Sequence, residues 1–337
     1  MPRVKKRIYN FDESIEDFMI YCTNKDLAKK TLKSYETTLK LFAKWLADEL
    51  KIFSPKDVTT KNIKEYLEFT KTKGKYTYVA NEKTLKYNNP TNRGDFGKQV
   101  SLYTVNNYLR NIKVFFTFLY DTGVLKENPT TPLKQYKHSR KPKNEIKDID
   151  FNKLLNAMDL TLFSEYRDYV IVQLLMDTGM RIGECLAMER ENVLVDKKAI
   201  FIPAEINKGR KDRYVFFGTK MQVILKRWIN YKERYTDTVF VFPTAKGTQL
   251  NLTHFEKNLK KYCDKAKLKE TITCHQIRNN FARRFLLSGG DIFILSKILG
   301  HSSVTVTEQA YLDVTQEDIR KKYIKYSPLE NFDRNRG

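Results

Sequence analysis

The chain has 337 residues, of which 41% are hydrophobic and 30% are charged, a balance typical of globular domains. No run of about 18 apolar residues occurs, which excludes a membrane span, and the N-terminus MPRVKKRIYNFDES has no apolar secretory signal. Lysine and arginine number 62 against 40 acidic residues, a formal charge of +22. This excess favours polyanion partners such as nucleic acid, with a merely basic soluble protein as the alternative.

The four cysteines are scattered along the chain and form no CxxC pair. This pattern disfavours a structural zinc site and favours reduced thiols in a cytoplasm. The sequence also has no GxxxxGK[ST] loop, no HExxH motif and no carboxylate cluster with metal-ligand spacing. We therefore expect a cytoplasmic protein with no metal and no other cofactor.

Residues 1–133 are predicted to form a helical domain. Apolar periodicity predicts its helices near 12–23 and over 28–50, 60–73 and 101–121. Pro129 then ends the helical pattern of this domain. Residues 74–100 are too long for a tight connection and could form a hairpin, a disordered loop or a loop that faces DNA.

Residues 134–149 are basic and almost without apolar side chains, which predicts an interdomain linker that could lie along DNA phosphates. The second domain, 150–337, is predicted to be α-rich. Short β-rich runs between turn residues predict a small antiparallel sheet within 191–218. Its helices are predicted at 150–158, 164–177, 181–189, 219–233, 253–266, 275–287, 291–299, 303–312 and 316–326. The expected fold class is mainly α, with this small sheet in the second domain.

Two of the four histidines lie in a segment rich in arginine. His275 and Arg278 are three residues apart and would share one helix face. His301 follows Gly300, a natural helix C-terminal residue, so its ring could point into a cleft. The plainer alternatives are a polar helix face and a capping histidine on the surface.

Two further cations stand where a phosphate could be bound. Arg181 follows a glycine turn and opens a helix, with Glu184 one turn later. Glu184 could orient Arg181 as a phosphate fork, or the two could form an ordinary surface ion pair. Lys208 lies in the basic turn NKGRKDRYVFF, where a solvated lysine is the better interpretation of that turn taken alone.

Taken in order, these motifs resemble those of the tyrosine recombinases, the phage integrase family. The resemblance covers 150–326 through TGMRIGE, KGRKDR, CHQIRNNFA and LGHSSVTVTEQAY, and the first helices are similar to that family's core-binding domain. It implies the tyrosine recombinase fold and a site-specific recombinase that cuts and rejoins DNA without metal or ATP. The implied intermediate is a 3′-phosphotyrosyl link, and the implied outcome is integration or excision of a mobile element, or Xer-like resolution.

The resemblance also implies a catalytic set of Arg181, Lys208, His275, Arg278, His301 and Tyr311, with Glu184 behind it. Tyr311 would be the nucleophile, Lys208 would protonate the leaving 5′-oxygen, and His275 would assist the tyrosine proton. Two features depart from the common pattern. Asn279 stands where many members carry another histidine, and the step from His301 to Tyr311 is one residue longer.

The expected partner is double-stranded DNA with specific sites. The resemblance implies a homotetramer in the synaptic complex, with a monomer as one option in free solution. The segment 315–332 could dock on a neighbouring subunit or fold onto its own domain, and packing would explain its tyrosines, Tyr323 and Tyr326. Two other functions stay open, namely a non-catalytic DNA-binding protein of the same fold and relaxation of DNA by a type IB topoisomerase.

Overall fold

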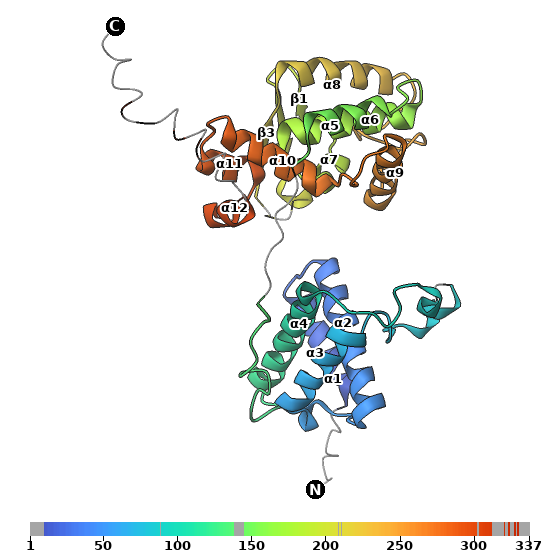
Figure 1. The fold of residues 1–337 in the computed structure, drawn as a ribbon, viewed down its shortest axis with the longest axis vertical. Coiled ribbons are helices and arrows are strands. Elements are labelled where there is room, and N and C mark those ends of the chain that lie inside the picture. Colours follow the sequence, from blue (N-terminus) through green and yellow to red (C-terminus); the bar gives the residue numbers. More distant parts are fainter. Residues whose placement is uncertain are drawn as a thin grey trace. The chain divides into compact units, whose positions relative to one another are not determined.

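The structure is a computed structural model that describes residues 10–87, 89–137, 145–207, 209, 211–301, 303–311, 320, 323, 327 and 329. For residues 82, 84, 306 and 309–311 it describes the backbone alone. The chain divides into two compact units, residues 1–140 and 141–337, each with its own hydrophobic core (Figure 1). No helix in these described ranges combines the length and the apolar character needed to cross a membrane.

The first unit is helical, as predicted. Its helices are α1 (Phe11–Asn24), α2 (Lys29–Leu50), α3 (Thr60–Lys73) and α4 (Leu102–Asp121). Helix α2 packs against the other three, because Leu39, Phe42 and Leu46 recur on one face and are almost fully buried. Ser101 caps α4 by accepting a hydrogen bond from the backbone N–H of Thr104.

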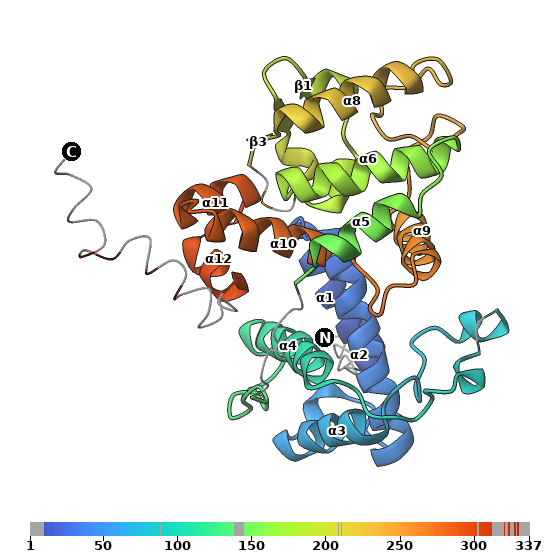
Figure 2. The same ribbon diagram turned by 45° about the horizontal axis from the view of Figure 1, so that its top comes forward.

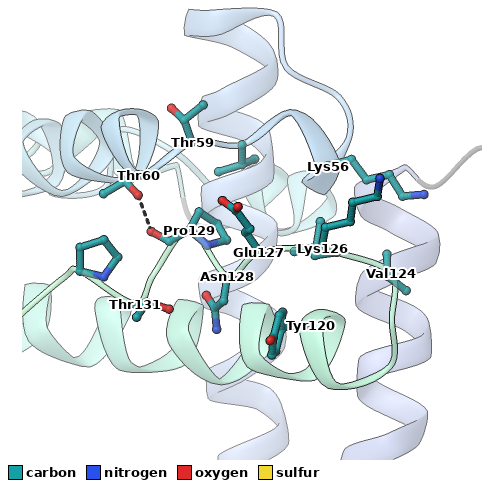
Figure 3. Close-up of a pocket in the computed structure, with 13 residues that line it drawn as sticks. Lys56, Thr59, Thr60, Tyr120, Val124, Lys126, Glu127, Asn128, Pro129 and Thr131 are labelled. Carbon is teal, nitrogen blue, oxygen red and sulfur yellow. Dashed lines mark hydrogen bonds between the residues drawn. The ribbon is translucent and has the colours of Figure 1, made fainter.

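The segment after α4 turns back onto the start of α3. The Thr60 hydroxyl donates to the Pro129 carbonyl at 2.7 Å, beside a groove that Figure 3 shows. None of the predicted catalytic residues lines this groove. Further along, Asn106 exchanges two hydrogen bonds with the backbone of Tyr136, at 2.8 and 2.9 Å. The first residues of the predicted linker therefore pack on the first unit.

The long connection between α3 and α4 is a loop closed at its base. It contains two short 3-10 helices, Glu82–Lys86 and Pro90–Asn92. The Lys75 N–H donates to the Lys98 carbonyl at 3.2 Å. Asp95 forms ion pairs with Lys75 at 2.8 Å and Arg93 at 3.0 Å, and these hydrogen bonds lower the pKa of its carboxyl to about 2.

The second unit is built around α6, which lies between α8 and α10 (Figures 1 and 2). Its helices are α5 (Asp148–Asn156), α6 (Phe163–Thr178), α7 (Ile182–Leu186), α8 (Thr219–Lys232), α9 (Leu252–Lys265), α10 (Cys274–Leu287), α11 (Ile292–Leu299) and α12 (Val304–Tyr311). Two helices, α5 and α7, differ from prediction by more than one residue at an end. Helix α5 begins inside the predicted linker, where Ile146 is buried, and α7 ends early because the Met188 carbonyl accepts from the Val241 N–H at 2.9 Å. The predicted helix 316–326 lies outside the described residues, apart from Arg320 and Tyr323.

In the described part of this unit, three short strands form an antiparallel sheet in the order β1 (Val193–Leu194), β2 (Ala199–Ile202), β3 (Arg213–Phe216). Ile200 pairs with Val215, and both side chains are fully buried. Phe201 pairs with Tyr214 on the opposite face, where Tyr214 is exposed. The predicted fold class, mainly α with a small sheet in the second unit, is confirmed. The basic turn lies between β2 and β3.

Candidate active site

Arg181 and Glu184 are placed by the turn between α6 and α7. Gly179 ends α6 in the left-handed conformation, with φ of 62°, and the chain then reverses into α7. One carboxylate oxygen of Glu184 accepts from the Arg181 backbone N–H at 2.8 Å, and the other accepts from the Arg181 guanidinium at 3.0 Å. The Glu184 side chain is only 2% exposed, so the carboxylate of this ion pair is buried.

Arg278 is carried by α10 and is almost buried, with 6% exposure. The helix starts at a capping box in which Thr273 and Gln276 each bind the other's backbone N–H, at 3.2 and 2.8 Å. The Arg278 guanidinium donates to the Gly179 carbonyl at 2.7 Å and to the Leu299 carbonyl at 2.8 Å. Arg278 therefore ties α10 to the C-terminal ends of α6 and α11.

His301 leaves the end of α11 just after Gly300, which has a left-handed φ of 62°. Its Nε2 lies 3.1 Å from an Arg278 guanidinium nitrogen, and its Nδ1 lies 2.8 Å from the hydroxyl of Thr307. A guanidinium can only donate, so Nε2 accepts, and in the neutral ring Nδ1 carries the proton and donates to Thr307. Thr307 is fully buried on α12.

The electrostatics of this site keep the imidazole neutral. Burial lowers the pKa of His301 to about 4, and the positive charges of Arg278, Arg181 and Arg213 act in the same direction. Burial alone would raise the pKa of the Glu184 carboxyl, but Arg213 and Arg181 outweigh it and hold that pKa below its ordinary value.

Across the described residues, no group of three or more His, Cys, Asp or Glu side chains is arranged to hold a metal ion.

Three consecutive carbonyl oxygens at the end of α11 each accept a hydrogen bond from a different arginine. The pairs are Ile298 with Arg213 at 3.2 Å, Leu299 with Arg278 at 2.8 Å, and Gly300 with Arg181 at 3.1 Å. Carbonyls at a helix C-terminus lack intrahelical partners and carry partial negative charge, so they attract cations. The end of α11 therefore gathers guanidinium groups from three separate segments.

The structure brings four of the predicted residues into one connected set: Arg181, Glu184, Arg278 and His301. Sequence reasoning missed Arg213 and Thr307, which complete the set. Arg213 ends the basic turn that the sequence singled out, but nothing local separates it from the other cations there. Thr307 is one of several hydroxyl residues in a polar run, and only its burial distinguishes it.

Lys208 lies outside the described residues, but its neighbour Gly209 is described. The Gly209 N–H donates to the Asn207 side chain at 2.9 Å, which fixes this part of the turn. A Cβ atom placed on Gly209 would lie 3.9 Å from the Gly300 carbonyl oxygen. Gly209 therefore lies beside the end of α11. His275 is exposed on the first turn of α10.

Tyr311 is the last residue of α12, and its side chain is outside the described part of the structure. Helix α12 packs against α10 and α11 (Figure 2). Of the two tyrosines in the segment 315–332, Tyr326 is outside the described residues, and Tyr323 is 65% exposed. Packing within the described unit does not account for Tyr323.

Two family models match the sequence. The model described as "Phage integrase family" matches residues 145–318, and "Phage integrase, N-terminal SAM-like domain" matches residues 15–87. Among curated proteins, tyrosine recombinase XerC of Oceanobacillus iheyensis is 26% identical over 324 residues, which cover 94% of this chain and 96% of that protein. Tyrosine recombinase XerD of Listeria monocytogenes is 23% identical and covers 94% of this chain and 99% of its own length.

Solved structures share the fold at lower sequence identity. The Tn1549 transposon integrase in complex with a circular intermediate DNA has a TM-score of 0.70 and 16% identity, with coverage of 94% of this chain and 99% of its own. A lambda integrase tetramer bound to a Holliday junction has a TM-score of 0.65 and 15% identity, with coverage of 90% and 84%. At these identities the likeness concerns the fold.

Proposed function

Because the chain belongs to the phage integrase family and is a tyrosine site-specific recombinase that acts on DNA, we propose that its phosphate site lies at the end of α11. Arg181, Arg278 and His301 surround one backbone phosphate there, and Tyr311 attacks it. The observation that carries this proposal is the convergence of three guanidinium groups and His301 on one helix end, beside the helix that ends at Tyr311.

The cations would stabilise the charge that develops on the phosphorane. Three guanidinium groups and the single Glu184 carboxylate leave an excess of positive charge around a neutral His301. Charge-assisted hydrogen bonds from arginine suit the non-bridging oxygens, since the guanidinium fork matches their spacing. A bound phosphate would also raise the pKa of His301, so that Nε2 gains a proton, gives up the hydrogen bond from Arg278 and donates to the phosphate instead.

Tyr311 would attack phosphorus with its phenolic oxygen. The bond from phosphorus to the 5′-oxygen breaks, a 3′-phosphotyrosyl bond forms, and one phosphoester replaces another. The phenol loses a proton and the leaving 5′-oxygen gains one, so the step is balanced without ATP. A 5′-hydroxyl from another strand can reverse the attack and join new partners.

Two residues would move these protons. Lys208 protonates the leaving 5′-oxygen, supported by the position of Gly209 beside the end of α11. His275, exposed on the first turn of α10, assists removal of the tyrosine proton. Both roles rest on the family resemblance together with these placements.

The substrate would be double-stranded DNA that carries specific sites, held by a tetramer during strand exchange. The basic composition supports DNA binding, and the solved lambda integrase tetramer bound to a Holliday junction supports the assembly. The same exchange gives integration, excision or resolution according to where the two sites lie.

Covalent trapping tests the reaction. The protein is incubated with 5′-labelled duplexes that have randomised sequence and a nick just 3′ of the central positions, and protein-linked strands are sequenced. After cleavage, the short fragment with the released 5′-hydroxyl diffuses away, so the 3′-phosphotyrosyl link cannot be reversed and adducts accumulate. We expect these adducts on one sequence class, because a site-specific recombinase cuts only at its own sites. Adducts on all sequences would instead indicate a topoisomerase, and binding without adducts would indicate a non-catalytic protein.

Replacement of the nucleophile identifies the attacking residue. Tyr311→Phe should reduce adducts on the selected duplex to background, because the phenolic oxygen is gone, while the Kd for that duplex stays within about threefold. Tyr323→Phe is the matched control and should react like the wild type. Adducts that survive in Tyr311→Phe would place the nucleophile elsewhere.

A further inference from the structure

Arg213 joins two parts of the phosphate site that are distant in sequence. It lies at the start of β3, and its side chain is 10% exposed. One guanidinium nitrogen lies 2.6 Å from a Glu184 carboxylate oxygen, and the Nε donates to the Ile298 carbonyl at 3.2 Å. Arg213 therefore holds Glu184 and the end of α11 at a fixed separation.

The fit around Arg213 is tight. A Cβ atom placed on Gly300 would lie 2.9 Å from the Arg213 Nε and 3.0 Å from two further atoms of that side chain. The guanidinium therefore lies directly against the Gly300 backbone, next to His301. A glycine there allows both the left-handed turn and this close approach.

The charges explain why Glu184 needs two arginines. Its carboxylate is 2% exposed, and a buried carboxylate with a single partner is costly. One oxygen faces the Arg181 guanidinium and the other faces Arg213, so the negative charge is shared between them. If Arg213 were absent, Arg181 would be the nearest remaining cation, and Glu184 would compete with a DNA phosphate for it.

We propose that Arg213 is a positioning residue for strand cleavage, acting through Glu184 and the end of α11 so that Arg181 presents its guanidinium to the scissile phosphate. The proposal rests on the function proposed above. The Arg181 side chain is 29% exposed and can reach a bound phosphate, whereas that of Arg213 is 10% exposed. Arg213 therefore orients Arg181, and Arg181 contacts the phosphate.

The test measures adduct formation at saturating DNA on the nicked duplex selected above. Arg213→Gln should slow adduct formation about 30-fold while the Kd for the duplex changes less than about threefold, because Arg213 acts through Arg181 on the reacting phosphate and not on the rest of the DNA. Arg213→Lys keeps the charge, so the rate of adduct formation should fall less, by about fivefold. If Arg213→Gln unfolds below the assay temperature, Arg213→Lys supplies the comparison of rate with Kd.

A double variant separates positioning from simple support of the fold. Arg213→Gln combined with Glu184→Gln should react at least about threefold faster than Arg213→Gln alone, because the unbalanced carboxylate no longer holds Arg181 back. Loss of the buried charge would also restore stability, so both variants are compared below their unfolding transitions, where a role limited to stability predicts equal rates. Arg190→Gln is the matched control, since Arg190 also binds one carbonyl, that of Val193, and one carboxylate, that of Glu233.

The outcomes distinguish this proposal from the function on which it rests. Wild-type adducts together with an unchanged rate in Arg213→Gln overturn the role of Arg213 alone. Equal losses in Arg213→Gln and Arg190→Gln, or a double variant that is no faster than Arg213→Gln, overturn it as well. Absence of adducts from the wild-type protein overturns both proposals.

Discussion

At the scale of single residues, His301 is held at both ring nitrogens. Arg278 donates to Nε2, and Nδ1 donates to the buried hydroxyl of Thr307. These contacts select one neutral tautomer, and the surrounding guanidinium charges disfavour the imidazolium. Thr307 lies one helical turn before Tyr311 in α12, so the hydrogen bond also joins His301 to the helix that carries the proposed nucleophile.

The ring of His301 should titrate near pH 4 in the DNA-free protein, compared with about 6.5 for an ordinary histidine. Between these values His301 is protonated in the unfolded chain and neutral in the folded protein. The contribution of neutral His301 to the free energy of unfolding is therefore fully present above about pH 6.5 and is lost as pH falls toward 4. Nitrogen-15 NMR of the imidazole rings, assigned by comparison with His301→Gln, gives the midpoint.

A second titration tests the role of the phosphate. With the selected duplex bound to Tyr311→Phe, the His301 midpoint should move upward, because the phosphate charge favours the imidazolium. A midpoint near 6.5 in the free protein would contradict the neutral state. A midpoint that DNA leaves unchanged would contradict contact with the phosphate.

At the scale of elements, two helix C-termini converge on one arginine. Helices α6 and α11 both end at a left-handed glycine, Gly179 and Gly300. Arg278 from α10 donates to the Gly179 carbonyl and to the Leu299 carbonyl. The negative ends of both helix dipoles therefore face the same guanidinium, which stabilises its charge where solvent is excluded.

Gly179→Ala should destabilise the second unit by about 2–4 kcal/mol, since the left-handed φ disfavours any side chain and packing adds a clash. The new Cβ atom would lie 2.1 Å from the Phe281 ring, which must then move away from the end of α6. Urea unfolding followed by circular dichroism measures the loss.

Gly183→Ala is the matched control for this change. Gly183 lies in α7 and does not have a positive φ, and a Cβ atom added to it would meet no other atom within 4 Å. Its replacement should leave stability within about 1 kcal/mol or raise it slightly. If both variants unfold at the same urea concentration, the packing of Gly179 against Phe281 does not matter for stability.

At the scale of the whole molecule, the positive charge is much larger than the catalytic site needs. The formal charge is +22, whereas the site accounts for three arginines and one carboxylate. Most of the excess is therefore available for contacts with phosphates away from the scissile bond. Such contacts hold DNA without reading its sequence.

DNA affinity should fall steeply with salt. If about six phosphates are neutralised, the logarithm of the association constant should fall with a slope near −5 against the logarithm of salt concentration. Fluorescence anisotropy between 50 and 200 mM salt, with Tyr311→Phe to prevent cleavage, should show a loss of about a thousandfold. An unrelated duplex of equal length is the control and should give weaker binding with a similar slope. A flat response would contradict extensive phosphate contact.

The sequence by itself determined the helices and the order of the chemical groups along the chain. Local apolar spacing and capping residues decide where α2, α4 and α10 form, and the sheet followed from β-rich runs between turns. The ends of elements were less predictable. Helix α7 stops early because the Val241 N–H donates to the Met188 carbonyl, and no local pattern contains that partner.

Only the tertiary structure decided which charged groups meet. Arg181 and Gly300 are separated by 119 positions, and Arg278 and Gly179 by 99, so periodicity within a helix carries no record of these contacts. Arg213 and Thr307 gain significance only from what lies against them, and the neutral state of His301 depends on burial and on cations from three segments. Local sequence fixes backbone conformation, but hydrogen-bond partners and pKa values depend on neighbours that folding supplies.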